Sequence, residues 1–253
     1  MIKLILVAPK FLLFFLYIIF GIMLGLLLSL VLGKIWYTHS AGRYIKLIWT
    51  KGVAFILGLK IKHNGKLCHE PKLIVSNHIS WLDIVVIGTT QPCVFIAKNS
   101  VTRWPIIGLL AQISGTLFLD RQNRKDLSKV MRKGKTAIDA GISLVFFPEA
   151  TTTDGKQLKP FHPSIYQTAI DTNCATQAIA ISYPVNTNNN KNKTSPAPYI
   201  DNDNFISHLI RILNAPGVDV CLQYCTPIPT TYNHDRKNLA LSTHNQVIKA
   251  LSL

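Results

Sequence analysis

A histidine and an aspartate five positions apart, His78 and Asp83, form the most reactive combination of side chains in this sequence. On one regular helix their side chains would point about 140° apart, so they meet only if a turn separates them. Asn77 and Ser80 favour such a turn. Asp83 would then accept the Nδ1 hydrogen of His78 and leave Nε2 free to take a proton from a substrate hydroxyl. The alternative is a partly buried histidine that a carboxylate satisfies without any reaction.

A second polar segment, Pro148-Glu149-Ala150-Thr151, follows the apolar run that ends at Phe147. Glu149 is one of only two glutamates in the chain, and a charge beside apolar neighbours needs partners, which favours a role in a site. The alternative is a glutamate that accepts hydrogen bonds from backbone amides and closes the loop.

A cation, Arg121, follows the apolar run 117–119 and Asp120. A guanidinium at a strand end suits a phosphate or a carboxylate. On its own it would also fit a solvated charge.

The elements that must position these residues are predicted from apolar periodicity. Short β-branched runs alternate with amphipathic stretches beyond residue 70, which is typical of an α/β fold. We expect strands at 73–76, 94–97, 116–119, 144–147, 178–182 and 218–224. We expect helices at 81–89, 105–113, 124–139, 163–172, 204–213 and 236–251. The polar stretch 186–204 is predicted to be a solvent loop outside the site.

The first 33 residues predict a membrane anchor, either transmembrane or membrane-embedded. Residues 11–33 carry no charge and the mean hydropathy of the chain is +0.25. As a helix these 23 residues would measure about 34 Å, against about 30 Å for a bilayer core. The apolar region of a cleaved signal peptide is shorter, so the anchor is favoured.

Positive charge follows the anchor directly. Residues 34–72 hold eight Lys and Arg with Glu70 as the only acid, in a chain of net charge +15. Such a flank binds anionic lipid and favours the cytoplasmic side. We therefore expect a basic interfacial helix and linker over 34–69, although an ordinary domain helix is an alternative, and a catalytic domain over 70–253. A nucleic-acid-binding protein tethered to the membrane would explain the charge, but it would explain neither Glu149 nor the pair His78 and Asp83. The five cysteines show no metal-ligand spacing and no disulfide pattern, so no metal is expected.

The candidate segments resemble, in order and spacing, the motifs of the glycerolipid acyltransferase family. Asn77-His78 with Asp83 is similar to its NHx4D motif, 118–121 to its FxDR-like motif, and 147–151 to its FPEGT motif. The strand-like run 179–184, which ends in Pro184, is similar to a weaker fourth block.

The resemblance implies a mixed central sheet flanked by helices. It also implies that His78 is the general base and Asp83 its orienting partner. Arg121, Glu149 and the loop with Thr151 would hold the acceptor headgroup, and Asn77, Pro148 and Ala150 would belong to the same site. Neither a cofactor nor a metal is implied, and the co-substrate would be acyl-CoA or an acyl carrier protein thioester. A bacterial inner-membrane enzyme with its domain in the cytoplasm is expected.

Two positions depart from the family pattern. Ala150 replaces a glycine, which matters if the position needs a positive φ, and Thr152 replaces an arginine that is common in lysophosphatidate enzymes. The expected reaction is acylation of 1-acyl-sn-glycerol-3-phosphate to phosphatidic acid. Thr152 favours lyso-ornithine lipid or another lysolipid as the alternative acceptor, and Ala150 raises the alternative of a catalytically silent lipid-binding protein.

Overall fold

The computed structural model describes residues 2–70, 72–120, 124–185, 194–200, 203–230 and 235–253. Within these residues one sheet has the strand order β1-β7-β6-β2-β5-β3-β4. The strands are β1 Leu59–Asn64, β2 Leu73–Ser76, β3 Cys93–Lys98, β4 Leu117–Leu119, β5 Ser143–Phe146, β6 Thr176–Ser182 and β7 Val218–Tyr224. All neighbours are parallel except β6 and β7, which are antiparallel, so the prediction of a mixed α/β sheet is confirmed.

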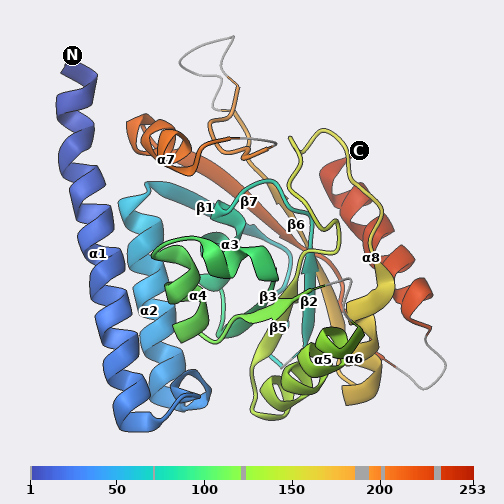
Figure 1. Ribbon diagram of the computed structural model, residues 1–253. Helices are drawn as coiled ribbons and strands as arrows, with labels where there is room; N and C mark the ends of the chain where they lie inside the picture. Colours follow the sequence, from blue (N-terminus) through green and yellow to red (C-terminus); the bar gives the residue numbers. More distant parts are fainter. Residues whose placement is uncertain (1, 71, 121–123, 186–193, 201–202, 231–234) are drawn as a thin grey trace.

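Helices cover both faces of this sheet (Figure 1). They are α1 Ile2–Leu32, α2 Ser40–Ile56, α3 Leu82–Gly88, α4 Ile107–Ile113, α5 Arg124–Asp139, α6 Tyr166–Thr172, α7 Phe205–Asn214 and α8 Arg236–Leu251. In the central strand β2, Ile74 packs with α1, α2, α3 and α7, whereas Leu73 and Val75 pack with α5, α6 and α8. Successive side chains of a strand point to opposite faces, so a fully apolar run buried on both sides builds two cores.

The edge strand β1 corrects the sequence prediction, which placed a linker at this position. Leu59 and Ile61 alternate with lysines, and the strand pairs in parallel with β7. An edge strand with one solvated face needs only a few apolar residues, so its signal is weak. The sheet therefore begins before residue 70. The other predicted elements agree with the structure within two residues at most ends; the helix predicted from Pro105 begins at Ile107, and a 3-10 turn, Pro163–Ile165, precedes α6.

Helices α1 and α2 form a hairpin with close backbone contact. The rings of Tyr17 and Trp49 stack with centroids 5.9 Å apart. Gly21 and Gly25 leave room for Trp49 and for Ile113 of α4, because a Cβ atom at either glycine would overlap those side chains. Small residues four apart commonly allow helices to approach in this way.

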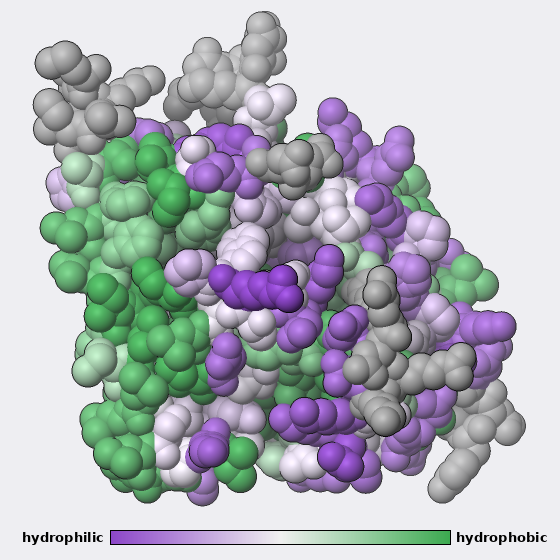
Figure 2. Space-filling view, in the orientation of Figure 1, coloured by the Kyte–Doolittle hydropathy of each residue, from purple (hydrophilic) through white to green (hydrophobic). Residues whose placement is uncertain are grey.

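The rest of the fold contacts α1 near one end and just beyond the other. Lys10 Nζ donates to the carbonyl of Leu213 over 3.5 Å, and beyond the other end Trp36 Nε1 donates to the carbonyl of Ile113 over 3.0 Å. The stretch Val7–Leu32 is long and apolar enough to cross a membrane. Its outward side chains form the hydrophobic flank on the left of Figure 2. Helix α1 therefore combines an apolar outer face with contacts to the domain along its length.

Candidate active site

The loop between β2 and α3 brings His78 and Asp83 together. His78 Nδ1 lies 2.8 Å from Asp83 Oδ2, and the amide of Asp83 donates to the carbonyl of Ser80 over 3.0 Å. This turn supplies the reversal that the spacing of five requires. Asp83 Oδ2 also accepts hydrogen bonds from the amides of Ile79 and Ser80, at 2.7 and 3.0 Å. Asp83 is fully buried, so these donors compensate for the loss of water around its charge.

His78 is held so that one ring nitrogen faces the site. Its ring stacks on Phe147 with centroids 4.0 Å apart, and 18% of its side chain is exposed. Because Nδ1 is engaged by Asp83, Nε2 is the nitrogen available to a ligand in the cavity that His78 lines.

Asn77 is fixed to the neighbouring strand. Its Nδ2 donates to the carbonyl of Ile181 over 2.9 Å, and its Oδ1 accepts from the amide of Ile181 over 2.8 Å. Asn77 is buried. The amide thus anchors the His78 loop to β6, and both of its functional groups are engaged by backbone.

Glu149 is engaged in a similar way. Its Oε1 accepts from the amide of His78 over 2.7 Å and its Oε2 accepts from the amide of Lys159 over 2.9 Å. Burial raises the pKa of Glu149, while these two hydrogen bonds act in the opposite direction. This is the arrangement expected of the alternative interpretation, in which the glutamate closes the loop. The carbonyl of Pro148 accepts from the amide of His162, which holds the same loop.

The loop after Glu149 forms one wall of the site. Ala150, Thr151 and Thr152 line the same cavity as His78, and the amide of Thr153 donates to the carbonyl of His78 over 2.9 Å. Ala150 has φ +70°, so the position where the family pattern has glycine does adopt the left-handed conformation. That conformation disfavours an alanine by roughly 1–2 kcal/mol relative to glycine.

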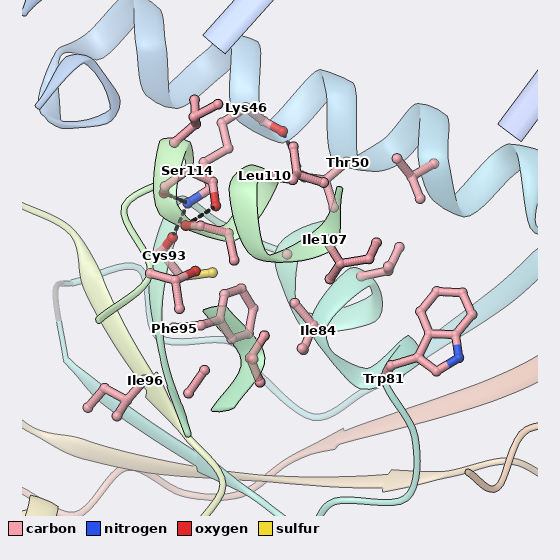
Figure 3. Close-up of a pocket in the computed structure, with 18 of the residues that line it drawn as sticks. Lys46, Thr50, Trp81, Ile84, Cys93, Phe95, Ile96, Ile107, Leu110 and Ser114 are labelled. Atoms are coloured by element: carbon pink, nitrogen blue, oxygen red, sulfur yellow. Dashed lines mark hydrogen bonds between the residues drawn. The ribbon is translucent and has the colours of Figure 1, made fainter. Parts of the chain in front are cut away.

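The cavity has a volume of about 460 Å³ and extends from His78 toward the space between α1, α2 and α4. Its wall is mainly apolar, with Ile84, Phe95, Ile107 and Leu110 among the side chains shown in Figure 3. A space of this size and character suits an aliphatic chain.

Two lysines line the cavity in the described part of the chain. Lys46 Nζ donates to the carbonyls of Cys93 and Ser114 over 2.9 and 2.8 Å (Figure 3), and burial lowers its pKa. Lys98, at the end of β3, is exposed. The predicted contact Arg121 lies outside the described residues.

Three aromatic residues of the site escaped the sequence analysis. Trp81 and Tyr199 line the cavity, and Tyr183 lies behind Asp83. The amide of Tyr199 donates to the carbonyl of Ile79 over 3.0 Å, so the prediction that 186–204 lies outside the site is wrong at this position. The less polar run 197–199, at the end of an Asn- and Lys-rich stretch, was the available signal.

The chain is similar to known proteins of one family. The family model described as Acyltransferase matches residues 59–182. The lyso-ornithine lipid O-acyltransferase of Pseudomonas aeruginosa is 34% identical over 203 residues, which are 80% of this chain and 76% of that protein. The chain belongs to the acyltransferase family. It is thus an O-acyltransferase of lysolipids, and the family prediction is confirmed.

Further relatives of this acyltransferase carry two acceptor names. The lyso-ornithine lipid O-acyltransferase of Brucella abortus is 34% identical over 77% of each chain. The 1-acyl-sn-glycerol-3-phosphate acyltransferase of Neisseria gonorrhoeae is 36% identical over 51% of each chain. The crystal structure of the 1-acyl-sn-glycerophosphate (LPA) acyltransferase PlsC from Thermotoga maritima shares the fold, with a TM-score of 0.69 at 19% identity over 99% of this chain and 95% of that one.

Proposed function

We propose that His78 is the general base of this acyltransferase and that Asp83 orients it. The hydrogen bond from His78 Nδ1 to the buried Asp83 carries the proposal, because it leaves Nε2 to accept the proton of the acceptor hydroxyl. The hydroxyl oxygen attacks the thioester carbonyl, a C–O bond forms and the C–S bond breaks. The proton on Nε2 then passes to the leaving thiolate.

The donor is proposed to be a fatty acyl thioester of coenzyme A or of acyl carrier protein. The apolar cavity that begins at His78 supports a long acyl chain as one of the groups bound. The net charge of the chain is +15, which favours an acidic partner. Coenzyme A and acyl carrier protein are both acidic carriers, so the charge suits either donor.

As the acceptor we propose lyso-ornithine lipid. Two relatives with this name align over about three quarters of their length, and Thr152 stands where an arginine contact to phosphate is common. An ornithine headgroup is zwitterionic and has a smaller requirement for cations.

The second candidate acceptor is 1-acyl-sn-glycerol-3-phosphate. Its support is the relative from Neisseria gonorrhoeae, which matches over half of each chain.

We propose that the enzyme rests in the cytoplasmic leaflet of a membrane, with the apolar face of α1 in lipid. The basic residues after α1 support contact with anionic headgroups. His78 then lies near the depth at which the hydroxyl of a lysolipid is presented.

The test is acyl transfer by membranes that contain wild-type enzyme, His78→Ala or His69→Ala. His69 is an exposed histidine outside the cavity and serves as the matched control. Labelled acyl-CoA and acyl-ACP are offered with a panel of lysolipids, and products are separated by mass. We expect acylated ornithine lipid from wild type and His69→Ala and at least about 100-fold less from His78→Ala. Exclusive formation of phosphatidic acid would select the second acceptor, and near-normal turnover by folded His78→Ala would contradict the base assignment.

A further inference from the structure

A tyrosine far along the chain completes the environment of Asp83. Tyr183 directly follows β6, and its Oη donates to Asp83 Oδ1 over 2.6 Å. Tyr183 is buried. A short hydrogen bond from a hydroxyl to a buried carboxylate is charge-assisted and stronger than a bond between neutral groups.

The two oxygens of Asp83 accept hydrogen bonds from different groups. Oδ2 accepts from His78 Nδ1 and from the amides of Ile79 and Ser80. Oδ1 accepts from the Tyr183 hydroxyl. Tyr183 therefore fixes the rotation of the carboxylate and draws negative charge toward the oxygen that does not contact His78.

We propose that Tyr183 is a positioning residue that sets the basicity of His78 through Asp83. The inference rests on the proposed role of His78 as general base. A carboxylate relieved of part of its charge attracts the Nδ1 proton less strongly and stabilises the imidazolium less. A base must be neutral to accept a proton, so the hydrogen bond from Tyr183 extends activity toward acid.

The phenol is suited to remain a donor. Burial and the negative charge of Asp83 raise the pKa of Tyr183 well above its ordinary value, so the hydroxyl keeps its proton and remains a donor. The other titratable groups around the pair are Glu149, which bonds the amide of His78, and the cavity-lining Lys46, Lys98 and Tyr199. None of these is altered by removal of the Tyr183 hydroxyl.

The test compares Tyr183→Phe with Tyr166→Phe in the full-length enzyme. Tyr166 is an equally buried tyrosine whose Oη bonds Thr243 Oγ1 over 2.7 Å in the opposite core, so its variant loses a similar hydrogen bond away from the site. For Tyr183→Phe we expect kcat to fall about tenfold. We also expect the acid limb of kcat/KM to move about half to one pH unit upward, with the acceptor KM little changed. Tyr166→Phe should leave the pH profile in place.

A second variant keeps the phenol ring and should shift the acid limb in the opposite direction. Replacement of Tyr183 by 3-fluorotyrosine makes the phenol a stronger donor, so the acid limb should move downward. In an Asp83→Asn background, Tyr183→Phe should add little further loss, because its effect passes through the carboxylate. A wild-type pH profile in both Tyr183 variants would overturn the proposal.

A readout that needs no turnover separates the two hypotheses. The pKa of His78, followed by NMR of the imidazole and assigned with His78→Ala, should rise in Tyr183→Phe. If wild type transfers no acyl group but this pKa rises, the proposed function fails while the coupling stands. An unchanged His78 pKa in an active enzyme would reject the role of Tyr183 and leave the proposed function intact.

Discussion

The carboxylate of Glu149 accepts a hydrogen bond from the backbone amide of His78, with 2.7 Å between Oε1 and the nitrogen. The second oxygen accepts from the amide of Lys159, 2.9 Å away. In return, the carbonyl of His78 accepts from the amide of Thr153. The two motif loops are therefore joined at both the amide and the carbonyl of His78. The orientation of the histidine depends on a glutamate that is distant in sequence and does not touch its ring nitrogens.

Glu149→Gln should destabilise the protein. The glutamine places an NH₂ group against one of the two backbone amides, and a buried donor without an acceptor costs about 1–3 kcal/mol. For a chain of this length the unfolding midpoint should fall by about 2–4 °C for each kcal/mol. Thermal unfolding of the purified variant measures this, and kcat should fall more than the acceptor KM rises.

A role of Glu149 in binding the acceptor predicts the opposite pattern of effects on the acceptor KM and on stability. In that case the acceptor KM rises while the unfolding midpoint stays near that of wild type. The exposed Asp139, paired with Lys135 on the surface of α5, offers a matched control. Asp139→Asn should change neither quantity appreciably, because exposed ion pairs contribute little.

Ala150→Gly should stabilise the protein. Ala150 has φ +70°, and relief of this strain is worth roughly 1–2 kcal/mol. The greater freedom of glycine in the unfolded chain offsets about 0.4–1 kcal/mol, so the net gain should be near 0.5–1 kcal/mol. Unfolding by heat or denaturant measures the difference.

Ala137→Gly, at a buried helical position in the last turn of α5, is the control for this substitution. Glycine there should destabilise by about 1 kcal/mol, because the backbone is helical. If both glycine variants lowered stability equally, strain at Ala150 would not be the cause. A change of acceptor preference in Ala150→Gly would show that the methyl group shapes the cavity that it lines.

The sequence predicted those parts of the site that depend on neighbours along the chain. His78 and Asp83 are close in sequence and their turn residues are local, so their contact was predictable. Apolar periodicity likewise indicated the central strands, which are buried on both faces.

The parts that escaped prediction depend on contacts across the fold. Tyr183 reaches Asp83 over 100 residues of chain, and no local pattern marks such a pair. Tyr199 follows a polar stretch that resembles solvent loop. The strand β1 has only two inward apolar residues at a sheet edge, so its burial comes from β7 and not from its own pattern. The two interpretations of Glu149 likewise differed only in tertiary partners, which local sequence does not encode.

Asp83→Asn should lower kcat by about 10² to 10⁴ without loss of the fold. The amides of Ile79 and Ser80 require an oxygen at the position of Oδ2, so the NH₂ of the asparagine faces the Tyr183 hydroxyl. The neutral amide then lacks the negative charge that stabilises the imidazolium formed when His78 takes the proton of the acceptor hydroxyl. Single-turnover acyl transfer measures the loss, and circular dichroism checks the fold. A kcat within threefold of wild type would show that Asp83 does not orient the base.

The length of α1 does not decide whether this helix crosses the membrane. The 26 residues Val7–Leu32 would measure about 39 Å as a helix, more than a bilayer core of about 30 Å. Contacts near both ends decide it. Lys10 bonds Leu213 and Trp36 bonds Ile113, so a helix that crossed the bilayer would have to leave one of these partners on the far side. We therefore expect both ends of α1 on the side of the catalytic domain.

Cysteines introduced at the exposed Ala8, Lys34 and Lys249 can test this in membrane vesicles of known orientation, and Ala8→Cys leaves Lys10 in place. Lys249, on α8, marks the side of the catalytic domain, and the parent enzyme corrects for native thiols. A membrane-impermeant maleimide should label all three positions in inside-out vesicles and none in right-side-out vesicles. If Ala8→Cys reacted from the face opposite to Lys34→Cys, α1 would cross the bilayer, and the contact between Lys10 and Leu213 would have to break in the membrane. The shared labelling face follows from the two contacts, because a helix bound to one domain at both ends has no free end to place across the lipid.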